Sequence, residues 1–195
     1  MIIKTLKRRQ FLTQVGVGLV GIGAVSMIDV SSSETANSNK RKLPGSGDGD
    51  IAVLQGALAL ENEGIAAYSI AGGSGLLSAE VLKVALVFLG HHKAHRDSLA
   101  SLIIKAGGKA ADPKSDAEYT RDLDLGSLKS QGDVVALAAR LEQGAANAYV
   151  GQVAALKDRS LATLFAQLST DEAVHWAVLN NALGNAVPAT PYLFG

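Results

Sequence analysis

The chain has 195 residues, of which 48% are hydrophobic, and its 18 basic and 18 acidic side chains give no net charge. It contains no cysteine, which excludes disulfides, thiolate metal sites, cysteine nucleophiles and a lipoprotein anchor. A high apolar content with only four prolines favours one compact, mostly helical domain with a sizeable core.

Residues 1–28 have the sequence features of a twin-arginine export signal. The pair Arg8-Arg9 lies in a basic start, and the apolar, glycine-rich stretch 15–28 follows it. We therefore expect a periplasmic or otherwise exported protein that the twin-arginine translocation machinery carries, with cleavage after Ser26 as one option. The alternative is an uncleaved anchor, although the stretch is short for a membrane span.

The signal also accounts for the neutral charge balance. Residues 1–42 hold seven basic and two acidic side chains, which leaves 11 basic and 16 acidic ones, about −5, for the remainder. A surface of that sign does not favour nucleic acid or an anionic membrane. We expect no nucleic-acid partner, and membrane contact only through the signal segment.

Four helical segments follow a polar linker at residues 29–49, which is rich in serine and glycine and typical of a flexible connection. Capping residues and glycine breakers predict where each helix begins and ends. The predicted helices run from Asp50, as N-cap, to Gly72, from after Ser78 to Gly107, from Asp133 to about Lys157, and from near Ser160 to Gly184. The tail at 185–195 is predicted to be a strap or to lack regular structure.

The connections between these segments predict how they are arranged. The first two helices are joined by a few residues, as are the last two, which predicts two antiparallel hairpins. The segment 107–132 is long for a bundle loop and can cross the length of the bundle, held there by Tyr119, Leu123 and Leu125. The sequence therefore predicts an all-α, antiparallel four-helix bundle over residues 50–184, built from two hairpins with one long crossover.

The two hairpins repeat one pattern of ionisable residues. Each has a glutamate in the motif L-E-x5-A-Y on its first helix and a pair of potential metal ligands, spaced i and i+3, on its second. They occupy positions where bundle packing requires hydrophobic residues. The six residues are Glu61, His92, His95, Glu142, Glu172 and His175.

All six are predicted to meet in one layer of the core. At a rise of about 1.5 Å per residue, the helix turns of Glu61, His92, Glu142 and Glu172 lie roughly 21–25 Å from their hairpin turns, and therefore at one level within about a turn. Six ionisable groups in one core layer are costly unless they are neutralised or bound to metal. Imidazole and carboxylate ligands suit iron, manganese or zinc, and glutamates can bridge two ions. The alternative is a buried hydrogen-bond network without metal.

Other residues near this layer are predicted to surround the ligands without binding metal directly. Tyr68 and Tyr149 lie on the faces of the two lone glutamates and are expected to pack beside them. Glu63 is predicted to lie on a different helix face, and His91 and Asp171 are predicted to face solvent or to support the ligands from outside. The adjacent glycines and alanines favour either close helix packing or room for a cofactor, and Trp176 is expected at the surface or an interface.

The repeat resembles the ferritin-like superfamily over residues 50–184, and in particular exported bacterial ferritin-like domains of the DUF4439 type. In di-metal members, two helices provide one glutamate each and two provide Glu-x-x-His. Glu61 and Glu142 match the single glutamates, and Glu172 with His175 matches one complete pair. The resemblance implies the ferritin-like form of the four-helix bundle and a metal site at these positions.

One position departs from the family's pattern, because His92 stands where a glutamate is expected before His95. The set then has three carboxylates and three histidines instead of four and two, which favours a single ion, zinc or manganese, or no metal. The resemblance implies an exported di-metal oxidase, ferroxidase or peroxide-consuming enzyme. The alternatives are a non-catalytic stress or binding protein with a degenerate site, and iron storage by a homo-oligomer.

Overall fold

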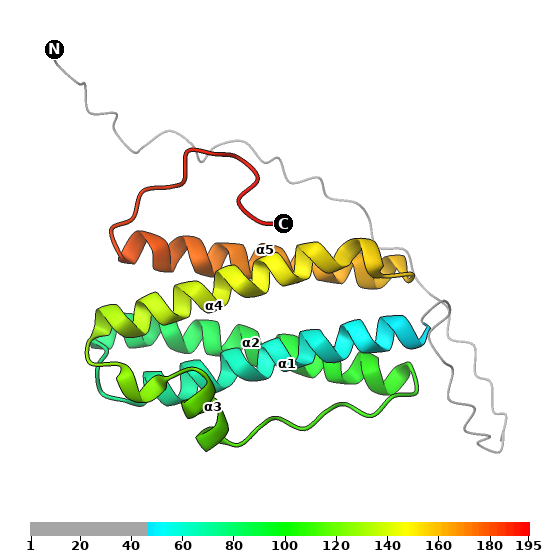
Figure 1. Ribbon diagram of the computed structural model, residues 1–195, viewed down its shortest axis with the longest axis horizontal. Coiled ribbons are helices and arrows are strands. Elements are labelled where there is room, and N and C mark those ends of the chain that lie inside the picture. Colours follow the sequence, from blue (N-terminus) through cyan, green and yellow to red (C-terminus); the bar gives the residue numbers. More distant parts are fainter. Residues whose placement is uncertain (1–46) are drawn as a thin grey trace, which may run out of the picture. The chain divides into compact units, whose positions relative to one another are not determined.

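The computed structural model describes residues 47–195 (Figure 1). The predicted export signal and residues 29–46 of the predicted linker lie outside this range. The described chain is helical and contains no strand, which confirms the predicted all-α fold. Its elements are α1 (Asp48–Gly72), α2 (Ala79–Lys105), α3 (Asp116–Asp122), the 3₁₀ turn η1 (Leu125–Ser127), α4 (Gln131–Gln152), the 3₁₀ turn η2 (Val153–Ala155) and α5 (Arg159–Ala182).

Side-chain caps fix where three of the long helices begin. The hydroxyl of Ser78 accepts from the third residue of α2, and Ser130 does the same for α4. Asp158 caps α5 by accepting from the backbone of Ser160. The predicted start of the third long helix at Asp133 was therefore late, because Ser130 is the residue that satisfies the first free N–H groups.

Asp50 is not the N-cap that the sequence analysis assigned to it. The helix α1 begins earlier, after Gly47, and Asp50 lies in its first turn with no exposed surface. Its two carboxylate oxygens accept from the backbone N–H groups of Lys157 and Asp158, at 3.0 and 3.2 Å. The carboxylate thus joins the start of α1 to the connection between α4 and α5.

The four long helices form two packed hairpins, α1 with α2 and α4 with α5, and α1 also packs against α4 (Figure 1). The start of α2 lies beside the start of α4, where Ser78 N donates to Gln131 Oε1 over 2.9 Å. With the contact of Asp50 at the opposite end, this makes α1 and α4 antiparallel. The backbones of α2 and α5 stay farther apart than those of the other neighbouring pairs.

The connection between the hairpins crosses the bundle lengthwise and contains the short helix α3 and the turn η1 (Figure 1). Tyr119 and Leu125 are buried, as predicted, whereas Leu123 is only half-buried. The hydroxyl of Tyr119 also accepts from the backbone N–H of Lys114. The crossover is therefore held in place mainly by two apolar anchors and a capping box at Ser115.

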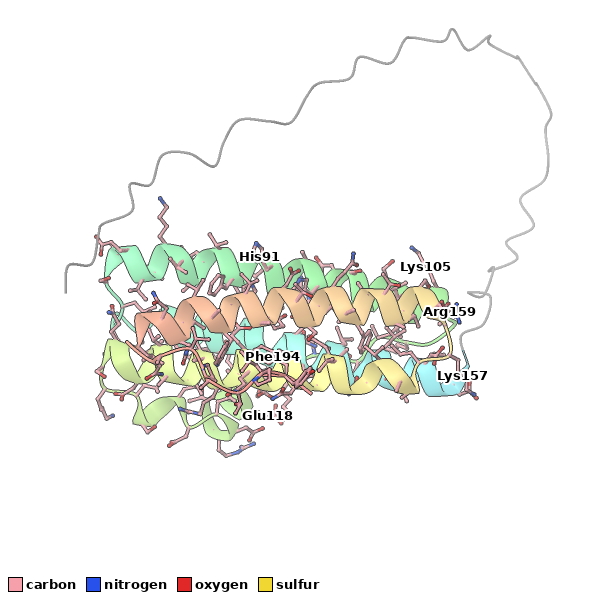
Figure 2. All side chains as sticks on the ribbon, turned by 90° about the horizontal axis from the view of Figure 1, so that it is seen from above. His91, Lys105, Glu118, Lys157, Arg159 and Phe194 are labelled. Atoms are coloured by element: carbon pink, nitrogen blue, oxygen red, sulfur yellow. The ribbon has the colours of Figure 1, made fainter. Side chains whose placement is uncertain are left out.

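The tail packs onto the bundle as a strap. The tail residue Phe194 lies against the bundle (Figure 2). Trp176 of α5 meets its ring edge-on at 5.3 Å and is only 9% exposed, so of the two places predicted for Trp176, the surface is wrong. The backbone of Gly195 donates to Asn147 Oδ1 on α4 over 3.1 Å. The sequence did not reveal this burial, because the partner ring comes from the tail.

Two hydrophobic clusters occupy the core, and a polar layer lies between them along every long helix. One cluster is centred on Leu54, Leu99, Tyr149 and Phe165, and the other on residues that include Tyr68, Phe88, Val135 and Leu179. Both sides of the polar layer are therefore sealed by apolar side chains. None of the helices between residues 47 and 195 is both long and apolar enough to span a membrane.

Candidate metal centre

The structure brings all six predicted ligands together in the polar layer of the bundle. Each of the four long helices contributes at least one of them. They meet because the ligands on each helix lie at similar distances from the hairpin turns. Glu61, His92, Glu142, Glu172 and His175 are at most 4% exposed. The side chain of His95 is 12% exposed and lies nearest to solvent.

The six residues form two overlapping groups of four. Within each group, every residue offers one ligand atom, and these atoms lie within 4.8 Å of one another. One group consists of Glu61, His92, His95 and Glu172, and the other of His92, Glu142, Glu172 and His175. Two residues, His92 and Glu172, belong to both groups and occupy equivalent positions of the repeat.

The two ring nitrogens of His92 face carboxylates from opposite halves of the repeat. Its Nδ1 lies 2.8 Å from Glu61 Oε2 and 3.8 Å from Glu172 Oε1. Its Nε2 lies 3.3 Å from Glu142 Oε1. The imidazole therefore spans the layer at the place where the family's pattern has a carboxylate.

The other two histidines each face Glu172 and one lone glutamate. His95 Nδ1 lies 3.2 Å from Glu172 Oε1 and 3.4 Å from Glu61 Oε1. His175 Nδ1 lies 3.0 Å from Glu172 Oε2 and 3.4 Å from Glu142 Oε2. Glu172 thus uses both oxygens, one toward each group.

The two tyrosines tie the halves of the repeat together. Tyr68 donates its hydroxyl to Glu142, and Tyr149 donates its hydroxyl to Glu61. The sequence analysis placed each tyrosine beside the glutamate of its own helix. The helices α1 and α4 are antiparallel and pack against each other, so each tyrosine hydroxyl reaches the glutamate of the facing helix.

Two polar residues support the histidines from outside the layer. The free Nε2 of His95 lies 3.2 Å from Asp171 Oδ2, and the free Nε2 of His175 lies 2.9 Å from Nδ1 of His91 (Figure 2). Contacts of this kind orient histidines that bind metal. Glu63 is half-buried and absent from both groups of four, which agrees with its predicted position on another face.

Burial and nearby opposite charges shift the pKa values of this layer in opposite directions. Burial lowers the pKa of His92, but hydrogen bonds to Glu142 and Glu61 outweigh it and raise the pKa to about 11. The same balance raises the pKa of His95 to about 10. Burial raises the pKa of Glu61, yet the hydrogen bond from His92 and the nearby imidazole of His95 leave it below its usual value. For Glu172, burial prevails and its pKa is raised.

Two buried atoms of the layer form no hydrogen bond of acceptable geometry. They are His95 Nδ1 and Glu172 Oε1, which lie 3.2 Å apart and belong to the same group of four. A buried polar atom without a partner is unfavourable, and such atoms are rare in folded proteins. Their imidazole and carboxylate chemistry fits a transition-metal ion, which would satisfy both atoms at once.

Gly64 lets the His92 ring approach α1. A Cβ atom at this position would lie 3.1 Å from both Cε1 and Nδ1 of the ring. The sequence analysis left open whether the small residues serve packing or a cofactor, and at this glycine they serve the approach of a potential ligand. A glycine in the middle of a helix, one turn after Glu61, was the signal for it.

We expect Gly64→Ala to shift the His92 ring by a few tenths of an ångström and to weaken metal binding by about tenfold, as for other changes that displace a ligand. Gly144→Ala is the matched control, because Gly144 has no atom within 4 Å of an added Cβ. That control should gain about 0.5–1 kcal/mol of helix stability and keep its affinity. Metal titration of both variants measures the effect, and equal affinities would contradict the assignment of Gly64.

The stability of the metal-free protein should fall as the pH rises above about 6.5. The folded-state pKa of His92, about 11, lies above the ordinary histidine value of 6.5. Its contribution is therefore complete below pH 6.5 and is lost as the pH rises toward 11. His95 acts in the same sense, with a pKa of about 10. Thermal unfolding in chelator at increasing pH measures the slope, which should be smaller in His92→Gln.

Metal should reverse this dependence on pH, because histidine binds an ion only in its neutral form. Binding then displaces the protons of the raised histidines, so affinity should increase with pH. Calorimetric titration in buffers with different ionisation enthalpies counts the protons released. Proton release near zero at pH 7 would show that the histidines do not bind the ion.

The chain is similar to known proteins over the whole bundle. The family model described as a ferritin-like domain matches residues 49–185, a range that includes all six residues of the layer. A crystal structure of a conserved hypothetical protein, rv2844, from Mycobacterium tuberculosis has a similar fold, with a TM-score of 0.63 and 27% sequence identity. The match covers 74% of this chain and 96% of that chain. No curated protein matches the chain.

Proposed function

Because the chain belongs to the ferritin-like domain family, we propose that the buried layer is a metal centre for one or two ions of iron or manganese, with zinc as the alternative. The observation that carries this proposal is the pair of four-residue groups that share His92 and Glu172. If His92 and Glu172 serve both groups, each of two ions has four ligand residues. A single ion could instead occupy either group. The unpartnered atoms of His95 and Glu172 support the same assignment.

We propose further that the centre serves an oxidase, ferroxidase or peroxide-consuming reaction. When bound, iron or manganese supplies the electrons and the Lewis acidity that such reactions with O2 or peroxide require. A hollow of about 20 Å³ adjoins His92 and Glu142, and this volume holds one water-sized molecule.

The residues around the centre have separate tasks in this proposal. Glu61 and Glu142 keep ionised oxygens toward the layer, because hydrogen bonds from the histidines hold the pKa of both below its usual value despite burial. Tyr68 and Tyr149 fix these carboxylates through their hydroxyl groups, and burial with the adjacent carboxylates raises the pKa of both tyrosines. Asp171 sits at the exposed side of His95, where its carboxylate holds the ring in place through Nε2.

We also propose that the protein acts outside the cytoplasm, as the exported ferritin-like domains of the DUF4439 type do. The support is the pair Arg8-Arg9 and the apolar stretch at 15–28, which both lie outside the described residues. Twin-arginine export of a folded chain agrees with a centre loaded before translocation. Fractionation of cells that carry Arg8→Lys with Arg9→Lys tests this, because export by another route would survive the double substitution.

Elemental analysis of the native protein is the direct test of the metal centre. We expect one to two equivalents of iron, manganese or zinc per chain, either as isolated or after reconstitution. Less than about 0.2 equivalents under both conditions would overturn the metal assignment. Loaded protein should then consume O2 or peroxide in the presence of a reductant, and metal-loaded protein that consumes neither would overturn the catalytic part alone.

A non-catalytic stress or binding protein is the second candidate. The observation in its favour is that the histidines neutralise the three carboxylates of the layer through contacts of 2.8–3.4 Å, without any ion. A degenerate layer of this kind predicts that Glu142→Ala with Glu172→Ala leaves the cellular phenotype unchanged. Loss of the phenotype in a variant that still folds would favour the metal centre.

A further inference from the structure

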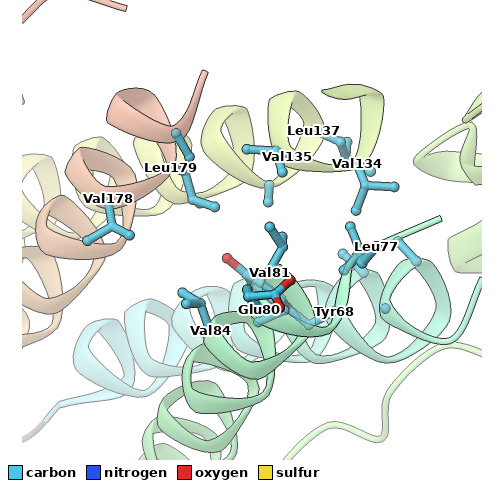
Figure 3. Close-up of a pocket in the computed structure, with 16 residues that line it drawn as sticks. Tyr68, Leu77, Glu80, Val81, Val84, Val134, Val135, Leu137, Val178 and Leu179 are labelled. Atoms are coloured by element: carbon cyan, nitrogen blue, oxygen red, sulfur yellow. The ribbon is translucent and has the colours of Figure 1, made fainter. Parts of the chain in front are cut away.

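An apolar pocket lies in the half of the bundle that contains the α1–α2 turn. Its volume is about 230 Å³, and all four long helices contribute to its walls (Figure 3). The walls are almost entirely hydrocarbon, with Val81 and Ala85 from α2 facing Val135 and Ala138 from α4. No pattern in the sequence predicts this pocket.

The pocket exists because small side chains line it where larger ones would fill it. Ala71 of α1, Ala138 of α4 and Ala182 of α5 each present only a methyl group. The backbones of α2 and α5 also stay apart, so they do not close the space between them. An unfilled apolar cavity of this size destabilises a protein, which favours a bound apolar molecule as its occupant.

The pocket opens to solvent between α2 and α5. Val84 of α2 is 38% exposed and Val178 of α5 is 44% exposed, and both line the pocket. Glu80 is the one charged side chain in the lining, and it is exposed. A molecule can therefore enter from this side with its polar end near a carboxylate.

Tyr68 connects the pocket to the polar layer. Its ring forms part of the pocket wall, and its hydroxyl donates to Glu142. Phe88 meets the Tyr68 ring edge-on at 6.2 Å and stacks on His175 at 4.1 Å. Two aromatic side chains thus separate an occupant of the pocket from the potential metal ligands.

We propose that this pocket binds an uncharged aliphatic molecule or chain end of about eight carbon atoms. A cavity of roughly 150 Å³ holds the six carbons of benzene, so 230 Å³ accommodates about nine non-hydrogen atoms, such as eight carbons and the oxygen of an alcohol. The carboxylate of Glu80 at the opening disfavours an anionic head group. The binding needs only apolar surface, so it does not depend on the proposed metal chemistry.

Titration of the full chain with 1-octanol, followed by calorimetry and by thermal unfolding, tests the proposal. We expect saturable binding with one molecule per chain and a melting temperature that rises with ligand concentration. Octanoate has the same chain length and should bind at least about tenfold more weakly because of its charge beside Glu80. The proposal would be overturned if 1-octanol showed no saturable binding up to its solubility limit. Tighter binding of octanoate than of 1-octanol would overturn the assignment of the ligand as uncharged.

Three variants locate the binding. Ala138→Phe fills the pocket and should abolish the binding of 1-octanol, while Val178→Glu places a charge at the exposed rim and should weaken it at least tenfold in a chain that still folds. Ala166→Leu is the control, because Ala166 is exposed on α5 and does not line the pocket. Unchanged affinity in Val178→Glu would assign any binding of 1-octanol to another surface and overturn the proposal.

Discussion

Glu172→Gln should lower the affinity for iron, manganese or zinc by at least about 100-fold, more than a change in a residue that only supports a ligand. Glu172 is fully buried and belongs to both four-residue groups, so its loss removes a donor from either arrangement. Glutamine has nearly the same shape and can still accept from His175, but it carries no charge. Metal titration of protein prepared with chelator measures the loss.

Glu63→Gln is the matched control for this prediction, since it makes the same chemical change in a half-buried glutamate outside both groups. We expect its metal affinity to stay within about twofold of the natural chain. Circular dichroism should show the same helix content in both variants. Equal affinity in Glu172→Gln and the natural chain would place the ion elsewhere or show that no ion binds in this layer.

Asp50→Ala should lower the free energy of unfolding by about 3 kcal/mol, because hydrogen bonds to a charged group contribute about 1.5–3 kcal/mol each. The Asp50 carboxylate has no exposed surface and accepts from the N–H groups of Lys157 and Asp158. Alanine would leave both N–H donors without this partner and would loosen the start of α5. Urea unfolding measures the change, and the melting temperature should fall by roughly 6–12 °C.

Asp48→Ala controls for the charge in the first turn of α1. Asp48 is acidic, lies two residues earlier and is exposed, so its removal should change stability by no more than about 0.5 kcal/mol. The loss of unfolding free energy in Asp50→Asn should lie between the losses in Asp50→Ala and Asp48→Ala, because asparagine keeps one carbonyl oxygen for two donors. A loss in Asp48→Ala as large as that in Asp50→Ala would assign the effect to the helix dipole and not to the hydrogen bonds.

The fold could be predicted from the sequence because its signals are local. Ser78 and the glycines that follow α1 and α2 fix helix ends through caps and backbone freedom, which depend on a few neighbouring residues. The prediction was less accurate where a distant partner decides the outcome. Asp50 has the sequence features of a cap, but its oxygens are taken by the backbone at residues 157 and 158. Trp176 is buried because Phe194 of the tail covers it.

Helical spacing and a repeated hairpin length place the six residues at one level, so their meeting could be predicted from the sequence alone. How they pair depends on the packing of the helices in three dimensions. The antiparallel packing of α1 on α4 sends each tyrosine to the opposite glutamate, and the missing side chain at Gly64 admits the His92 ring. The apolar pocket was likewise beyond the sequence, because its volume depends on the spacing between α2 and α5, which no residue pattern along one helix encodes.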